Sequence, residues 1–222
     1  MPRKSGVTAA ARTPRHGVAT SRSCFLSSGR VRSSTILQCR SRPFRRSWCV
    51  SRIARRSRRA LELTILTAVR TSEALQASWS EFDLKARLWV IPADRMKAGK
   101  EHRVPLSQQA LALLESLPRV GPFVFPGIKP GKPLSNMAME MVLRRMEVTD
   151  CTVHGFRSSF RDWCREKTAF PRDIAEMALA HAVGSDVERA YRRGDALEKR
   201  RELMAQSGAY ATSLNPKTNP KD

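Results

Sequence analysis

Apolar side chains recur every three or four residues through much of the chain downstream of Ala60, which is the spacing of one face of an α-helix. A dense apolar segment predicts a first short helix, and its members are Leu61, Leu63, Ile65, Leu66 and Val69. Further helices are predicted where a capping residue or a proline precedes such spacing, at Ser107, Ser135, Thr152 and Pro171. We therefore expect a mainly helical domain.

One region has the pattern of strands. Residues 88–91 read Leu-Trp-Val-Ile, which is typical of a strand. Residues 95–97 and 102–106 flank a short loop that contains Gly99, which predicts a hairpin. The expected fold class is therefore α+β, mainly α-helical, with a small three-stranded antiparallel sheet.

The composition of the chain changes near residue 60. Residues 1–59 are rich in Arg, Ser and Cys, contain no acidic residue and show no sustained apolar period. Three interpretations stay open: a basic arm on DNA, a transit peptide, or a segment without an evolved fold, such as a translated shifted reading frame, and we favour the last. We expect an Arg/Ser-rich arm over residues 1–57, a globular domain over 58–207 and a polar tail over 208–222.

The net charge of +21 predicts a polyanionic partner, most simply nucleic acid. The charge is unevenly distributed, however. Residues 1–61 hold 16 of the 41 basic residues and none of the 20 acidic ones, so the remaining chain carries 25 bases against 20 acids. The strong basic character therefore belongs mainly to the first quarter of the chain and says little about the globular part.

The cysteines, histidines and apolar segments argue against several kinds of site. The five cysteines include no Cys-x-x-Cys pair and the histidines lack metal-ligand spacing, so neither a disulfide framework nor a metal site is predicted. No apolar run is long enough to span a membrane. We expect a protein of a reducing compartment, with no metal and no membrane partner.

Two basic side chains share the first turn of the helix predicted after Thr152. The apolar stripe of that helix consists of Phe156, Phe160, Trp163 and Cys164. His154 and Arg157 lie on a different face and are expected side by side. An anion at this helix N-terminus would also be stabilised by the helix dipole and the free amides. A solvated basic face is the alternative interpretation.

His181 and Tyr191 are two further candidates. His181 ends an apolar helix predicted over residues 174–180, and Tyr191 lies in a short helix that a Ser185-x-x-Glu188 capping box begins. Each has an ordinary structural explanation, as a helix-end histidine and a packed tyrosine. Together with arginines and a lysine, they could instead bind a phosphodiester, protonate its leaving group and attack it covalently.

Four segments, in order, resemble the motifs of the tyrosine recombinase family, which includes phage and prophage integrases. The segment from Arg70 to Leu75 is similar to the first arginine box, and Met96-Lys97 with residues 104–107 is similar to the lysine-bearing hairpin. His154-Gly-Phe-Arg157 resembles the His-x-x-Arg box. Leu179-Ala-His181, with Tyr191 ten residues later, resembles the third box and the nucleophile. The resemblance covers roughly residues 58–206, the catalytic domain, and departs at Ala180, where many members have glycine.

The resemblance implies a complete catalytic set, which consists of Arg70, Lys97, His154, Arg157, His181 and Tyr191. The two arginines and His181 would donate hydrogen bonds to the non-bridging phosphate oxygens. Tyr191 would attack phosphorus with His154 accepting its proton, and Lys97 would protonate the departing 5′ oxygen. Glu73 would orient an arginine. The product would be a 3′-phosphotyrosyl linkage, formed without a metal or any other cofactor.

The resemblance also implies the partners of the protein. These are double-stranded DNA at attachment sites and three further copies of the chain in a homo-tetramer on DNA, in the bacterial cytoplasm and associated with the nucleoid. Integrases of this type have an arm-binding and a core-binding domain before the catalytic one. The basic arm occupies that place here, so we expect a truncated prophage-type integrase.

Two alternative functions stay open at this point. A type IB topoisomerase-like strand transferase would share the fold and the chemistry, but it would relax supercoils without strand exchange. A noncatalytic, basic DNA-binding remnant would need neither Tyr191 nor the spaced histidines, so the intact set of six residues argues against it.

Overall fold

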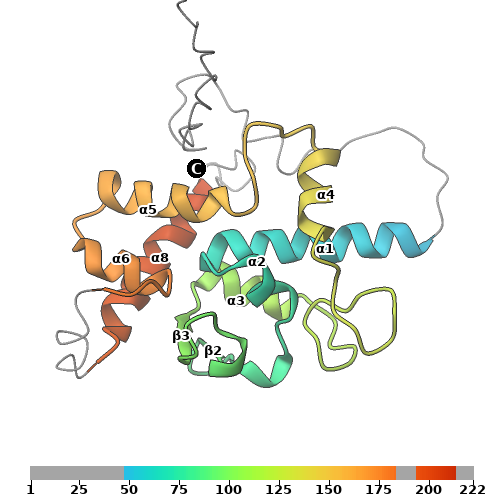
Figure 1. Ribbon diagram of the computed structural model, residues 1–222, viewed down its shortest axis with the longest axis horizontal. Helices are drawn as coiled ribbons and strands as arrows, with labels where there is room; N and C mark the ends of the chain where they lie inside the picture. Colours follow the sequence, from blue (N-terminus) through green and yellow to red (C-terminus); the bar gives the residue numbers. More distant parts are fainter. Residues whose placement is uncertain (1–47, 184–193, 214–222) are drawn as a thin grey trace, which may run out of the picture.

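The chain places a small sheet beneath a set of helices in the computed structural model, which describes residues 48–183 and 194–213 (Figure 1). Helix α1 (Trp48–Thr67) is followed by the short helix α2 (Thr71–Leu75). The strands are β1 (Phe82–Asp83), β2 (Leu88–Ile91) and β3 (His102–Pro105). The later helices are α3 (Gln108–Glu115), α4 (Ala138–Arg145), α5 (Gly155–Lys167), α6 (Arg172–Ala178) and α8 (Leu197–Ser213). The expected class, α+β and mainly helical, is confirmed.

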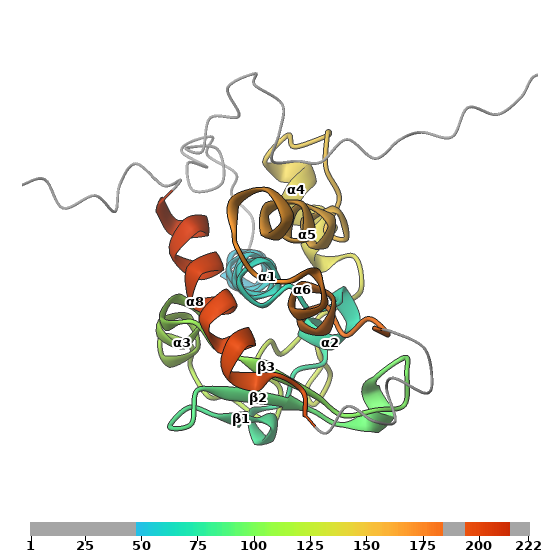
Figure 2. The ribbon, with the colours of Figure 1, turned by 90° about the vertical axis from the view of Figure 1, so that its left-hand side faces the viewer.

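Helix α1 is the centre of the packing. Seen along its axis, α3 and α8 lie on one side of it, α4 and α5 lie above it and the sheet lies below it (Figure 2). Its residues Ala60, Leu63 and Leu66 are almost completely buried in the main apolar cluster. A second apolar cluster joins α5, α6 and α8 through Phe160, Leu179 and Leu203. The two clusters hold α5 and α6 against the C-terminal end of α1.

Helix α1 begins earlier than the apolar pattern predicts, and the boundary expected between residues 57 and 58 falls inside it. Ser57 is buried, and its hydroxyl donates to the Ile53 carbonyl at 2.8 Å. The Arg56 guanidinium donates to the Pro126 carbonyl at 3.0 Å. These residues lack a dense apolar pattern, yet they extend the helix because their polar groups find partners within it and on the loop before α4.

The sheet has three antiparallel strands in the order β1-β2-β3, and Val90 pairs with Arg103. The expected strand at 88–91 and the expected second arm of the hairpin are present, but residues 95–97 do not form a strand. Pro92 follows β2, and residues 93–95 form the 3-10 helix η3 (Ala93–Arg95), whose turns are closed by the amides of Arg95 and Met96. These amides bond within the turn and not to a neighbouring strand. The third strand is β1.

Helix α8 continues to Ser213, past the expected start of a polar tail at residue 208. Gly208 is buried where α8 crosses the start of α3, and a Cβ at this position would lie 2.6 Å from Ser107 Oγ. Tyr210 stacks on Trp163 of α5 with ring centroids 5.5 Å apart. The glycine therefore permits a close contact between two helices and does not end α8. None of the helices described here combines the length and apolar character needed to cross a membrane.

Candidate active site

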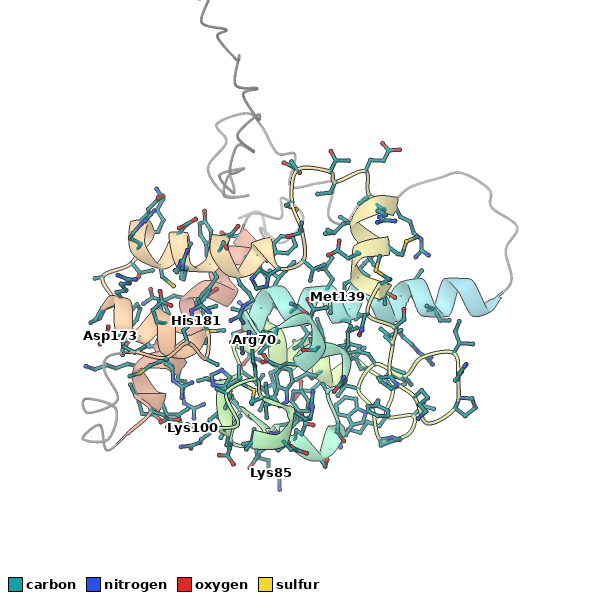
Figure 3. All side chains as sticks on the ribbon, viewed as in Figure 1. Arg70, Lys85, Lys100, Met139, Asp173 and His181 are labelled. Atoms are coloured by element: carbon teal, nitrogen blue, oxygen red, sulfur yellow. The ribbon has the colours of Figure 1, made fainter. Side chains whose placement is uncertain are left out.

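Three segments that are far apart in the sequence meet at the C-terminal end of α1. They are the α1–α2 connection, the first turn of α5 and the turn after α6, and they carry Arg70, Arg157 and His181. Arg70 and His181 lie near one another in Figure 3. Ala68 and Ala180 both have φ of 53°, in the left-handed region that ends a helix abruptly. The carbonyl of each of these alanines accepts a hydrogen bond from one of the arginines.

Arg70 lies immediately before α2 and is held by a carboxylate. Its backbone amide and its guanidinium Nη1 donate to the two oxygens of Glu73, at 2.7 and 2.8 Å. Nη2 points to the Ala180 carbonyl at 3.4 Å. The Glu73 side chain is only 2% exposed, whereas that of Arg70 is 25% exposed. The guanidinium is therefore fixed from its buried side and open to solvent on the other.

Arg157 is buried, although its helix position had also allowed a solvated basic face. Nη1 donates to the Ala68 carbonyl, and Nη2 donates to the Leu179 carbonyl at 2.6 Å. Burial, and next the nearby charge of Arg70, lower the pKa of Arg157 to about 10, so it stays protonated at neutral pH. Its two carbonyl partners come from the segments that follow α1 and α6. The solvated-face alternative is therefore excluded for Arg157.

His181 is held by a residue that the sequence analysis did not select. Its Nδ1 lies 2.6 Å from Glu176 Oε2, and its backbone amide donates to the Glu176 carbonyl at 2.9 Å. Its Nε2 lies 3.4 Å from Nη2 of Arg157. Glu176 stands five residues before His181 across the end of α6, a spacing that becomes a contact only because Ala180 turns the chain back. This turn also explains why glycine suits position 180.

His102 is also a residue that no motif indicates, and unlike Glu176 it is buried. It lies in β3 and is 8% exposed. Its pKa is lowered to about 4, first by desolvation and then by the charge of Arg200, while Glu73 and a hydrogen bond to the Ala178 backbone act in the opposite direction. The imidazole is therefore neutral at physiological pH. The available signal was its position along the predicted strand, where His102 shares a face with the apolar Val104 and the charged Arg103 lies between them.

Lys97 and His154 are at the solvent surface. Lys97 is exposed in the connection between β2 and β3, just after η3, and it makes no ion pair with any residue that the structure describes. His154 is exposed at the N-cap position of α5. The expectation that His154 and Arg157 project side by side is not met, because Arg157 turns inward to its two carbonyls. A ligand in contact with both would have to reach from the surface to the buried guanidinium.

Tyr191 lies outside the described residues, as do Ser185 and Glu188 of the expected capping box. The described chain resumes at Gly194, three residues after the tyrosine. The structure therefore brings together Arg70, Arg157 and His181, leaves Lys97 and His154 on the surface, and does not place Tyr191.

The described part of the site can bind an anion. Arg70 and His181 are 25% and 39% exposed in their side chains, so a ligand can reach them while Glu73 and Glu176 hold them from behind. Hydrogen-bond donors fixed in this way toward developing negative charge are worth roughly 3–4 kcal/mol each in a transition state. Among residues 48–183 and 194–213, no group of three or more His, Cys, Asp or Glu side chains could hold a metal ion.

Comparison with known proteins gives consistent matches. The model of the phage integrase family matches residues 46–198. Prophage integrase IntA of Escherichia coli (strain K12) is 43% identical over 145 residues, which cover 63% of this chain and 35% of that protein. The integrase of Enterobacteria phage P4 is 35% identical over 168 residues, which cover 67% of this chain and 38% of that protein. The chain thus spans well under half the length of these curated relatives.

A solved structure has a similar fold. The integrase from mycobacterium phage Brujita aligns with a TM-score of 0.55 and 18% identity over 75% of this chain and 59% of that one. The region matched by the family model covers more than half of the chain and includes all six candidate catalytic residues. The chain therefore belongs to the phage integrase family.

Proposed function

We propose that this chain contains the catalytic domain of a site-specific DNA recombinase, which cuts and rejoins strands through a 3′-phosphotyrosyl intermediate. The observation that carries the proposal is the meeting of Arg70, Arg157 and His181 from three distant segments. Their partners are carboxylates and backbone carbonyls that orient them without covering Arg70 or His181. The names of the relatives support the same activity.

The first step of the reaction transfers phosphorus from an oxygen of DNA to an oxygen of the protein. The Tyr191 hydroxyl attacks the phosphodiester, a bond forms between its oxygen and phosphorus, and the bond from phosphorus to the 5′ oxygen breaks. His154 accepts the phenolic proton, and Lys97 gives a proton to the departing 5′ oxygen. Attack by another 5′ hydroxyl reverses these transfers and reseals the strand, so the bond energy is conserved.

The arginines and His181 stabilise the charge that grows on the non-bridging oxygens. Arg157 donates to two carbonyls and keeps further N–H groups for phosphate, because a guanidinium has more donors than those two bonds use. Its burial raises the strength of each interaction, since the local dielectric constant is lower than in water. The same proposal includes the substrate, which is double-stranded DNA at attachment sites. It also includes a homo-tetramer on DNA and a location at the bacterial nucleoid.

The decisive test is a covalent adduct that depends on Tyr191. The chain is incubated with a pool of nicked duplexes of randomised central sequence, in which cleavage releases a short oligonucleotide and prevents resealing. We expect a denaturant-stable protein–DNA adduct with the parent chain and none with Tyr191→Phe. The duplex recovered from the adducts then serves as a defined substrate.

Tyr210→Phe is the matched control for this test, because Tyr210 is the other tyrosine of the chain and its ring stacks on Trp163. It should form the adduct at the parent rate. Adduct formation by Tyr191→Phe, or no adduct with the parent chain, would contradict the proposed function. Relaxation of a supercoiled plasmid without exchange between two duplexes would instead indicate a type IB topoisomerase.

A further inference from the structure

Arg200 is a buried cation that the proposed reaction does not use. It lies in the first turn of α8 with a side chain only 2% exposed. Nε and Nη2 donate to the backbone carbonyl and the carboxylate Oδ2 of Asp195, at 2.8 and 2.6 Å. Nη1 donates to the Arg103 carbonyl at 2.6 Å. Desolvation lowers its pKa, and Asp195 acts against this effect.

These three bonds join two parts of the chain that lead to the proposed chemistry. Arg103 lies in β3, the strand that follows the connection carrying Lys97. Asp195 is four residues after Tyr191 and precedes α8. The Arg103 guanidinium also approaches Asp195 Oδ2, at 3.6 Å. Arg200 therefore links Asp195, which follows Tyr191 in the sequence, to β3, which follows Lys97.

Anchoring α8 does not require this cation. Leu203 and Met204 are almost completely buried in the cluster shared with α5 and α6, and Tyr210 stacks on Trp163 further along the helix. An apolar side chain at position 200 would avoid the loss of hydration that a buried guanidinium suffers. A forked cation is favoured here for a different reason, which is that it can hold one carboxylate and two carbonyls in a single geometry.

We propose that Arg200 is a positioning residue of the cleavage reaction, which acts by fixing Asp195 against β3 and thereby fixing the end of the segment that carries Tyr191. The inference rests on the proposed function, because it takes Tyr191 as the nucleophile. A nucleophile misplaced by about 1 Å loses on the order of a hundredfold in rate. Loss of the anchor should therefore reduce the rate of attack without changing the surface that binds DNA.

The test compares Arg200→Met and Asp195→Ala with Arg201→Met as the matched control. Arg201 is the next residue of α8, but its guanidinium is partly exposed and donates to the Ala86 carbonyl at 3.2 Å. Each variant is given saturating amounts of the duplex recovered with the parent chain. A second version of that duplex has sulfur in place of the 5′ bridging oxygen, so its leaving group needs no general acid. Lys97→Ala serves as the reference for a defect that sulfur corrects.

We expect Arg200→Met to form the adduct about tenfold to a hundredfold more slowly than the parent on both duplexes, with an unchanged dissociation constant for DNA. Asp195→Ala should be slower on both duplexes as well. If Arg200→Met does not fold, Asp195→Ala provides the test, because the Asp195 side chain is 40% exposed and its loss leaves no cavity. Arg201→Met should match the parent.

Three outcomes would overturn the inference. The first is an adduct rate equal to that of the parent in the folded Arg200 and Asp195 variants. The second is a defect that the sulfur duplex removes, since the anchor would then act on proton transfer from Lys97. The third is an equal defect in Arg201→Met. If the parent chain itself forms no Tyr191-dependent adduct, it is the proposed function that fails.

Discussion

The three side chains of the site are held by two kinds of acceptor. Arg157 donates to two backbone carbonyls, whereas Arg70 and His181 each contact a carboxylate, from Glu73 and Glu176. A side chain that is already held loses less conformational freedom when it binds an anion. The site is therefore organised before any ligand arrives, and its acceptors matter as much as its donors.

Glu176→Gln should slow cleavage without weakening DNA binding. The Glu176 carboxylate lies 2.6 Å from Nδ1 of His181 and fixes the ring with Nε2 toward Arg157. A glutamine amide is a weaker acceptor than a carboxylate, so it holds the ring less firmly. We expect the rate of adduct formation at saturating DNA to fall about tenfold to a hundredfold.

Glu166→Gln is the control for this change, because it removes a carboxylate from the neighbouring helix α5 where the side chain is one third exposed. Its adduct rate should equal that of the parent. An unchanged rate in Glu176→Gln would show that the Glu176–His181 contact has no part in the reaction.

At the scale of elements, the contact between α3 and α8 depends on the absence of a side chain. Ser107 caps α3 by accepting a hydrogen bond from the Ala110 amide at 3.2 Å. Gly208 allows α8 to pass over this cap, since a Cβ there would lie 2.6 Å from Ser107 Oγ and 2.7 Å from Ser107 Cβ. The Cβ of Ser107 cannot move without shifting the start of α3.

Gly208→Val should therefore lower the free energy of unfolding by about 1–3 kcal/mol through overpacking. Urea unfolding followed by circular dichroism measures the change. Ala209→Val introduces the same β-branched residue at the next, exposed position, where it costs only helix propensity, whereas Gly208→Val loses none and its cost is steric. Equal stability of the two variants would contradict the close contact.

Strands β2 and β3 follow from local pattern, but their pairing and the path between them do not. Residues 88–91 and 102–105 form strands as predicted, yet they pair with each other, whereas the predicted hairpin joined residues 95–97 to 102–106. Residues 95–97 are also compatible with a strand by composition. The amides of Arg95 and Met96 bond within a 3-10 turn instead, and the Arg95 guanidinium contacts Glu81 and the Glu73 carbonyl. The conformation of this loop therefore depends on Glu73 and Glu81, which lie elsewhere in the sequence.

At the scale of the whole molecule, His102 links the buried interior to the pH dependence of folding. Its folded-state pKa of about 4 is below the ordinary value of 6.5, because burial and the charge of Arg200 disfavour the protonated form. The unfolded chain therefore binds a proton first as the pH falls. The contribution of His102 to the free energy of unfolding is fully present above about pH 6.5 and is lost as the pH falls toward 4.

We expect the parent chain to lose about 2 kcal/mol of unfolding free energy between pH 7 and pH 5 through this group, and His102→Gln to lack that loss. Urea titrations at the two pH values measure it. His154→Gln is the control, since its ring is exposed at the start of α5 and should leave the difference unchanged. A pH dependence identical in His102→Gln and the parent would contradict the assignment.

Much of the fold was predictable because local period and capping encode helices and strands. The mainly helical class, the strand at 88–91 and the helices after Ser107 and Thr152 follow from residues that lie within a few positions of each other. The motifs of the family are also local. Helix ends were less predictable, since α1 and α8 both extend beyond their apolar patterns through contacts with distant segments.

The sequence by itself determined the fold class, the family and the identity of the motif residues, since each depends on short-range order and spacing. Only the tertiary structure decided that Arg157 is buried, that Glu176 holds His181 and that Arg200 ties Asp195 to β3. A charged side chain can be buried only where acceptors surround it. Those acceptors are carbonyls and carboxylates brought together by chain turns, and no local pattern records which distant segments will supply them.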